Sequence, residues 1–278
     1  MRRALVLPAL LLVALACEAP PAAKPAPKAA PEPKLEPQPE PAPKTEEPPA
    51  DPLALPSVEG VHYFERVTGG AAADAELPMI VAIHGLGDNP RDFAHLFDGF
   101  DQPARVIFPR ALDAHEPGWS WFPIRARDPD VEALAAGIEK AADTLAPAIA
   151  ALAKDRPTVG KPIVTGFSQG GMLTFTLAVH HGELFSAAFP VGGWFPPPLM
   201  DDADKTAPAD APPMVAFHGD QDRAVKYLPT AECVAALQEA DYSVELKTYE
   251  GVGHAIPPAM RAELMAGITG ALPSAPAN

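Results

Sequence analysis

The sequence predicts an α/β fold in which helices cover both faces of a mainly parallel sheet. Short apolar runs rich in β-branched residues alternate with longer runs of helical pattern from about residue 60 onward. Parallel strands need a crossover connection, usually a helix, so this alternation is typical of a parallel sheet. Several runs are apolar throughout, which indicates strands buried on both faces. The chain of 278 residues suffices for one large domain of this class, and it contains no internal repeat.

Residues 1–16 have the pattern of a secretory signal peptide. Two arginines precede an apolar stretch that is too short to span a membrane and that ends in small residues. Cys17 follows directly, as in bacterial lipoprotein signals where this cysteine receives the lipid, although Ala14 stands where such signals usually have leucine. We therefore expect an exported protein that is lipid-anchored to the cell envelope. Glu18 is not the aspartate that signals inner-membrane retention, which favours the outer membrane; secretion or a periplasmic location is the alternative.

Segment 17–56 is predicted to be a proline-rich linker without a core. Proline, alanine, lysine and glutamate dominate it, so it lacks the apolar side chains that a core needs. This composition favours extended polyproline II, and we interpret the segment as a spacer, with a docking ligand for an envelope partner as the alternative. The folded domain is expected over 57–273, followed by a short tail, 274–278.

Charge and cysteine content argue against several classes of function. The net charge of −15 argues against nucleic-acid binding, because phosphates repel an acidic protein. Cysteines and histidines show no metal-ligand spacing, and we expect neither a metal nor another cofactor. Besides Cys17 the only cysteine is Cys233, which we expect to be a buried small apolar residue in a helix.

The expected elements follow one another in alternation. Strands are expected over 61–67, 77–83, 105–108, 162–165, 187–191, 213–217 and 243–249. Helices are expected over 131–153, 172–179, 230–240 and 257–272, with a further one from Pro90. Asp88 or Asn89 would cap the helix from Pro90, and Asp130 would cap the alanine-rich helix. Pro147 is expected to kink or split that long helix.

Two aromatic segments, 118–123 and 194–200, lie outside these elements. The first contains Trp119, Trp121 and Phe122. Such side chains in a loop need packing partners, so we expect them to wall a substrate pocket, with coverage of a sheet edge as the alternative. The second segment is expected to form an aromatic flap.

Ser168 lies in the pentapeptide Gly166-Phe167-Ser168-Gln169-Gly170, between a predicted strand and a predicted helix. A nucleophile elbow has Gly-x-Ser-x-Gly in a tight turn between a strand and a helix. Its strained backbone directs the serine hydroxyl into a cleft. Strand and helix then pass so closely that only glycine fits two residues to either side. The alternative is a glycine-rich turn with an incidental serine.

A nucleophilic serine needs a base, and the base needs an acid that fixes its tautomer. In an α/β-hydrolase the chain order is serine, acid, histidine, each after a strand. Ser168, Asp222 and His254 have this order, and each follows a predicted strand end. Asp220 follows the same strand as Asp222 but directly at its end, where we expect it to hold the turn.

The other histidines fit the role less well. His84 precedes the serine, and His218 is expected to be a buried structural group. His180 and His181 lie about three helical turns from the serine. The oxyanion would be bound by two backbone N–H groups, those of Gln169 and of Leu86, which stands between two glycines; a plain flexible turn at 85–87 is the alternative.

These motifs together resemble the phospholipase/carboxylesterase family, which includes the acyl-protein thioesterases. The resemblance covers about residues 60–272 and rests on five motifs: His84-Gly85-Leu86-Gly87-Asp88, Trp121-Phe122, Gly166 to Gly171, His218-Gly219-Asp220-Gln221-Asp222 and Gly251-Val252-Gly253-His254. It implies a compact α/β-hydrolase with little lid that hydrolyses carboxylic esters or thioesters, with Asp222 at the acid position.

We therefore expect a serine esterase that cleaves short- to medium-chain acyl esters or lysophospholipids through an acyl-enzyme. A serine peptidase or an acyl-thioesterase of the same fold is the alternative, and a non-catalytic envelope-binding lipoprotein is the alternative from another class. The predicted signal peptide and the proline-rich segment depart from the usual cytosolic members of the family. This departure argues against intracellular protein depalmitoylation.

Overall fold

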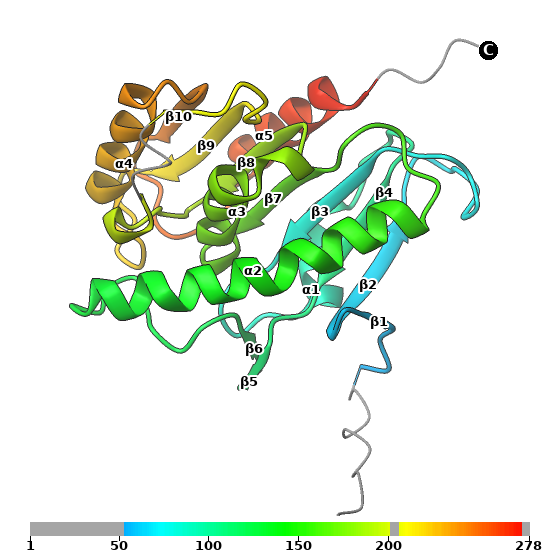
Figure 1. Cartoon of the computed structure of the whole chain (residues 1–278), viewed down its shortest axis with the longest axis horizontal. Coiled ribbons are helices and arrows are strands. Elements are labelled where there is room, and N and C mark those ends of the chain that lie inside the picture. Colours follow the sequence, from blue (N-terminus) through cyan, green and yellow to red (C-terminus); the bar gives the residue numbers. More distant parts are fainter. Residues whose placement is uncertain (1–52, 201–205, 274–278) are drawn as a thin grey trace, which may run out of the picture. The chain divides into compact units, whose positions relative to one another are not determined.

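The core of the domain is an eight-stranded sheet in the order β1-β2-β4-β3-β7-β8-β9-β10. The computed structural model describes residues 53–200 and 206–273. Strands β4, β3, β7, β8, β9 and β10 run parallel to one another, and β2 and β1 join the edge in antiparallel register. The predicted α/β class with a mainly parallel sheet is therefore confirmed (Figure 1).

Part of the predicted organisation lies outside the described residues. The chain divides into two units, Met1–Pro48 and Pro49–Asn278, of which the second contains the sheet. The predicted signal peptide 1–16, Cys17, the predicted linker up to residue 52 and the tail 274–278 lie outside the described residues. In the part that is described, no helix combines the length and the apolar character that crossing a membrane would require.

The elements have the following bounds. The strands are β1 (Ser57–Val58), β2 (Val61–Val67), β3 (Met79–Ile83), β4 (Arg105–Pro109), β5 (Asp113–His115), β6 (Gly118–Ser120), β7 (Ile163–Phe167), β8 (Ala187–Val191), β9 (Met214–Gly219) and β10 (Val244–Tyr249). The helices are α1 (Pro90–Phe93), α2 (Val131–Asp155), α3 (Gln169–His180), α4 (Tyr227–Glu239) and α5 (Pro258–Ala271), with 3₁₀ turns η1 (Ala94–Phe97), η2 (Gly182–Leu184) and η3 (Pro197–Leu199).

Helices cover both faces of the sheet, as the continuous apolar strands predict. In β3, Val81 and Ile83 belong to one apolar cluster, whereas Ile80 and Ala82 belong to a second. Helices α2, α3 and α4 supply the first cluster, and α1 and α5 supply the second. Because successive side chains of a strand point to opposite faces, both sets must be apolar for the sheet to lie between two helical layers.

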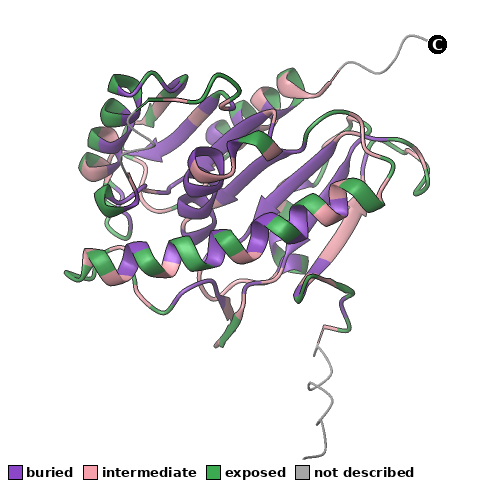
Figure 2. Cartoon of the chain, viewed as in Figure 1, coloured by how far each residue is buried: buried purple, intermediate pink, exposed green. Residues whose placement is uncertain are grey.

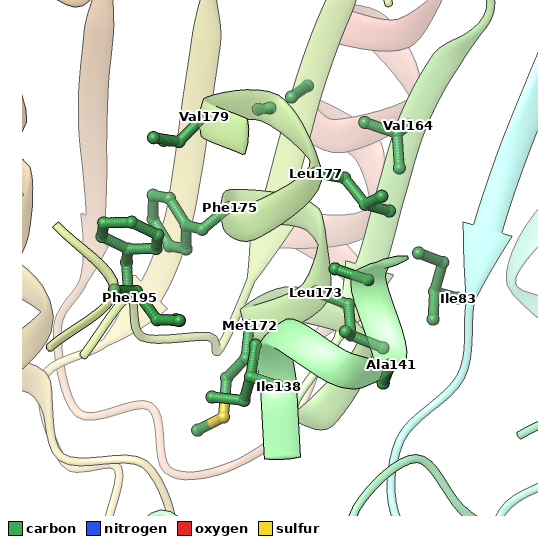
Figure 3. Packing of buried hydrophobic residues seen from close by; sticks show 14 of the residues in the cluster. Ile83, Ile138, Ala141, Val164, Met172, Leu173, Phe175, Leu177, Val179 and Phe195 are labelled. Atoms are coloured by element: carbon green, nitrogen blue, oxygen red, sulfur yellow. The ribbon is translucent and has the colours of Figure 1, made fainter. Parts of the chain in front are cut away.

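Helix α3 is buried almost completely between the sheet and α2. Figure 3 shows Met172 and Leu173 of α3 beside Ile138 and Ala141 of α2, in the cluster that also includes Val164 of β7. Every residue of α3 before His180 is buried. The helix that follows the elbow serine is therefore held on all sides.

The sequence predicts that Pro147 kinks or splits α2, and a split is ruled out. The helix is continuous from Val131 to Asp155, and Asp130 caps it by accepting a hydrogen bond from the Ala133 N–H at 2.9 Å. Proline costs one backbone hydrogen bond. The residues around it, Leu145, Ala146, Ala148 and Ile149, are buried against α3 and the sheet, and this packing outweighs the loss. Figure 2 shows α2 with a buried stripe on one side and an exposed one on the other.

The first of the two aromatic segments, 118–123, differs from the expectation. It begins as strand β6, which pairs with the preceding strand β5, and its end turns inward so that Trp121 and Phe122 are buried in the core rather than walling a pocket. Trp119 remains half-buried, with the Arg110 guanidinium over its ring. The second segment, 194–200, lines a separate apolar cavity of about 320 Å³ against α4.

The crossing of α3 over β3 and β7 leaves no room for side chains at its glycines. A Cβ atom on Gly170 would clash with the carbonyl groups of Ile83 and His84, and one on Gly166 would clash with the carbonyl of Gly170. A Cβ on Gly171 would meet the carbonyl oxygen of Val191. The two glycines of the pentapeptide are therefore required by backbone packing, as the sequence predicts.

The substitution Gly170→Ala tests this close packing, and the same substitution at a glycine with no close neighbours is the control. We expect Gly170→Ala to lower the free energy of unfolding by about 3 kcal/mol, because rigid backbone must move to admit the methyl group. Gly270→Ala is the matched control, since it adds the same methyl group in helix α5, where no atom of the described residues lies within 4 Å of it. It should raise stability by about 0.5–1 kcal/mol. Equal midpoints in urea for the two variants would contradict the close crossing.

Candidate active site

Four strand ends at one edge of the sheet bring the predicted site residues together. The loops after β3, β7, β9 and β10 carry Leu86, Ser168, Asp222 and His254 respectively. These strands are parallel, so their carboxyl ends meet at the same edge. Residues that are far apart in sequence thereby become neighbours.

Ser168 stands in a strained turn between β7 and α3. Its backbone has φ 60° and ψ −115°, a conformation with positive φ that a residue with a Cβ rarely adopts. Hydrogen bonds hold the turn on both sides: the Ser168 N–H donates to the Val191 carbonyl at 3.0 Å, and its carbonyl accepts from the Met172 N–H at 3.0 Å. The strain and its anchoring are those of a nucleophile elbow.

The hydroxyl, an imidazole and a carboxylate form one hydrogen-bonded chain. Ser168 Oγ lies 2.9 Å from His254 Nε2, and His254 Nδ1 lies 2.7 Å from Asp222 Oδ2. Because an ionised carboxylate only accepts, Nδ1 carries the proton and Nε2 is left as the acceptor for the serine hydroxyl. In this tautomer the imidazole can take the serine proton.

Asp222 is buried and fixed by the loop that follows it. Its Oδ1 accepts hydrogen bonds from the N–H groups of Ala224 at 2.9 Å and Val225 at 3.0 Å. Burial raises the pKa of this carboxyl, but the bond and charge of His254 and the two backbone donors outweigh burial, so the pKa lies below its ordinary value. The carboxylate is therefore ionised and oriented at neutral pH.

Asp220 has a different partner. Its Oδ1 accepts a hydrogen bond from the Gly251 N–H at 2.8 Å, so it ties the loop after β9 to the loop that carries His254. That loop is also held by a contact of the His254 ring with the Phe167 ring, with 4.7 Å between ring centroids and 30° between planes. The two aspartates thus differ as the sequence argument expects: Asp222 contacts the imidazole, and Asp220 holds a turn.

Leu86 and Gln169 line the same pocket as Ser168 and His254. Within residues 53–200 and 206–273, neither backbone N–H is used in a hydrogen bond. The Gln169 N–H also opens helix α3, where the macrodipole favours negative charge. Two free donors next to the nucleophile are the arrangement that an oxyanion hole requires.

The side chain of Gln169 has a role that the sequence analysis missed. Its Oε1 accepts from the Trp121 N–H at 3.0 Å, and its Nε2 donates to the Phe122 carbonyl at 2.8 Å. The Trp121 indole in turn donates to the carbonyl of His84 at 2.9 Å. The buried aromatic pair therefore fastens the Leu86 loop to the elbow, and the only signal for this in the sequence is the Trp-Phe pair itself.

His84 and His218 are buried structural groups. Burial lowers the pKa of His84 to about 4, so its ring is neutral; Nε2 accepts from the Ala111 N–H at 3.1 Å. Burial likewise lowers the pKa of His218, whose Nε2 donates to the Val225 carbonyl at 2.9 Å. His181 lies against Asp143 at the far end of α3. His218 Nε2 also lies 3.5 Å from Asp222 Oδ2, so this ring borders the acid that bonds His254. Among the described histidines, His254 is the one that bonds the Ser168 hydroxyl.

The pocket above Ser168 has a volume of about 250 Å³. Its walls include Met172, Ala224 and Val225, and on loop 121–130 also Arg125 and Arg127, which the sequence analysis did not single out. Trp119, Trp121 and Phe122 are not among the lining residues.

Cys233 is buried in α4, as expected, and burial raises the pKa of its thiol to about 12. No group of three or more His, Cys, Asp or Glu side chains is arranged to hold a metal ion within the described ranges.

Comparison with known proteins gives a consistent result. The sequence profile of the family described as Phospholipase/Carboxylesterase matches residues 69–268. A protein of Oryza sativa subsp. japonica named as a probable carboxylesterase is 27% identical over 207 residues, which are 67% of this chain and 74% of the relative. Acyl-protein thioesterase 1 of Gibberella zeae is 24% identical over 210 residues, 67% of this chain and 87% of the relative.

Solved structures show the same fold. The crystal structure of esterase PE8 matches with a TM-score of 0.66 at 23% identity, covering 76% of this chain and 99% of the esterase. The predicted α/β-hydrolase fold is thereby confirmed.

Substituting each aspartate by asparagine separates their roles. In Asp222→Asn the new amide would present an N–H to Nδ1 and reverse the imidazole tautomer, so kcat on an ester should fall by roughly 10⁴-fold at a nearly unchanged Tm. Asp220→Asn is the matched control, because the amide oxygen can still accept from Gly251; kcat should stay within about threefold and stability within about 1 kcal/mol. An inactive Asp220 variant beside an active Asp222 variant would reverse the assignment.

Proposed function

Because this chain belongs to the phospholipase/carboxylesterase family, whose chemistry is ester hydrolysis, we propose that it cleaves carboxylic esters through an acyl-enzyme on Ser168. The observation that carries this proposal is the unbroken hydrogen-bonded chain from Ser168 Oγ through His254 to Asp222, with separations of 2.9 and 2.7 Å. It ends at a serine in a strained elbow, which supports a nucleophile rather than an incidental turn.

The proposed acylation begins when Ser168 Oγ attacks the ester carbonyl carbon and its proton passes to His254 Nε2. Asp222 stabilises the resulting imidazolium. The negative charge that develops on the carbonyl oxygen is bound by the N–H groups of Leu86 and Gln169. Collapse of the tetrahedral intermediate breaks the bond to the alcohol oxygen, which receives the proton from His254.

Deacylation repeats these steps with water. His254 accepts a proton from a water molecule that attacks the acyl carbon, the same two N–H groups bind the oxyanion, and Ser168 regains its proton as the acid leaves. No step needs a group beyond those already named.

We expect short- to medium-chain acyl esters or lysophospholipids as substrates. The pocket of about 250 Å³ is small, which supports a short acyl group or a partly exposed substrate. An acyl-thioesterase activity is the second candidate, and it is favoured by the likeness to acyl-protein thioesterase 1. A thioester carbonyl would meet the same nucleophile and the same two donors.

We further propose that the protein is exported and held at the cell envelope by a lipid on Cys17. The support is the pattern of residues 1–16 with a cysteine directly after the small residues. The proline-rich segment up to residue 56 would then act as a spacer between anchor and enzyme.

Ser168→Ala tests the nucleophile. It should lower kcat on p-nitrophenyl esters by roughly 10³-fold or more while the Tm is preserved, because the oxyanion donors remain but no acyl-enzyme forms. A fluorophosphonate should label the wild type at Ser168 alone, and Ser186→Ala, a serine on another loop, serves as control. Wild-type turnover by Ser168→Ala would show that another group is the nucleophile, and a wild type without turnover would favour the non-catalytic binding protein.

Cys17→Ser tests the anchor. A diacylated cysteine binds a membrane stably, because each buried CH₂ contributes about 0.8 kcal/mol. The substitution should therefore move the protein from the membrane fraction to the soluble fraction. Cys233→Ser alters the other cysteine, which is buried, and should leave the fractionation unchanged. A soluble wild type whose mature N-terminus carries no lipid in mass spectrometry would contradict the proposal.

A further inference from the structure

Two cationic side chains line the pocket of Ser168 without a part in the steps above. Arg125 and Arg127 belong to the loop between β6 and α2 and line this pocket together with Ser168 and His254. The chain as a whole has a net charge of −15. Arg125 and Arg127 are positively charged, and no Asp or Glu is among the described residues that line this pocket.

Neither of these two guanidinium groups forms an ion pair or a side-chain hydrogen bond within the described part of the chain. Several arginines elsewhere in the domain are engaged: Arg66 lies 2.9 Å from Asp98, and Arg156 lies 3.1 Å from Glu65. Both arginines are exposed to solvent as well as lining the pocket, so their guanidinium groups are available to a ligand that enters it.

The carboxylates of the same loop are already occupied by backbone donors. Asp128 Oδ1 accepts from the Asp130 N–H at 3.2 Å, and Asp130 Oδ1 accepts from the Ala133 N–H at 2.9 Å. These bonds form the start of α2. The Asp128 N–H also donates to the Arg125 carbonyl at 2.9 Å, which closes a turn over the segment that carries both arginines.

The loop is fastened to the catalytic groups at its beginning. The carbonyl of Phe122, which is buried, accepts a hydrogen bond from the Gln169 side chain at 2.8 Å. Further along, Ile124 and Ala126 pack against the apolar cluster of α2 and α3. The residue that offers an oxyanion donor thus also holds the beginning of the loop that carries the arginines.

We propose that this pocket selects esters that carry an anionic group, a carboxylate or a phosphate, and that Arg125 and Arg127 bind that group. The inference rests on the proposed esterase function of Ser168. Guanidinium groups donate paired hydrogen bonds that match the oxygen geometry of both anions. An anion in the pocket would be attracted by both positive charges. The arginines determine specificity and take no part in proton transfer.

The test compares each anionic ester with a neutral ester of similar shape. Para-acetoxybenzoate carries a carboxylate on the alcohol side of the ester, and para-acetoxybenzamide is its neutral partner. Mono-p-nitrophenyl adipate carries a carboxylate on the acyl side, and p-nitrophenyl hexanoate is its neutral partner. Para-acetoxyphenyl phosphate and para-methoxyphenyl acetate provide the phosphate arm. The quantity measured is the ratio of kcat/KM for the anionic ester to that for its neutral partner, in wild type and in the double variant Arg125→Gln/Arg127→Gln.

In at least one arm this ratio should fall about tenfold in the double variant, and Arg125→Lys/Arg127→Lys should restore part of it, because charge returns without the guanidinium fork. The effect should weaken as ionic strength rises. Lys140→Gln/Lys154→Gln removes two exposed charges from α2 and is the matched control, in which the ratio should not change.

Three results would overturn the inference. Unchanged ratios in every arm would show that the arginines do not select an anion. If the same assays are repeated with anionic vesicles and activity is lost only there, the arginines would be assigned to a membrane surface instead. In both cases the esterase itself would still be active. A wild type that hydrolyses none of the six esters would contradict the proposed function, and the inference with it.

Discussion

The close crossing of α3 over the ends of β3 and β7 is the constraint on which the rest of the site depends. Backbone approaches backbone so closely at Gly166 and Gly170 that no Cβ fits. The turn between them can then be closed only by holding Ser168 at positive φ. That strain costs on the order of 1–3 kcal/mol, and the buried packing of α3 offsets it. The hydroxyl is thereby directed to the sheet edge, and the helix N-terminus with its free N–H groups lies beside it.

The remaining groups reach the serine because parallel strands end at one edge. His254 arrives from the loop after β10, where Asp220 bonds the Gly251 N–H, and Asp222 arrives from the loop after β9. On the other side, the side chain of Gln169 holds the buried aromatic pair that fastens the Leu86 loop. One residue therefore links the nucleophile turn, the expected oxyanion donors and the loop of the two arginines.

The sequence predicts those features that local pattern determines. Apolar runs indicate the strands, and chain order with strand ends predicts that Ser168, Asp222 and His254 lie together. It predicts poorly what depends on distant packing. A proline destabilises a helix interior, but packing can offset this loss. In α2 the burial of the residues around Pro147 keeps the helix continuous. The inward turn of Trp121 and Phe122 depends on the Gln169 side chain, which lies 48 residues beyond Trp121 in the chain. Arg125 and Arg127 look like ordinary surface charges until the fold brings their loop to the pocket.

The central claim is that this geometry makes Ser168 the nucleophile and the Leu86 and Gln169 N–H groups the oxyanion donors. A crystal structure of the protein inactivated by an alkyl fluorophosphonate tests both parts together. The account predicts phosphorus bonded to Ser168 Oγ and the phosphoryl oxygen within about 3 Å of both N–H groups. A phosphoryl oxygen directed away from both donors, or phosphorus on another side chain, would contradict it.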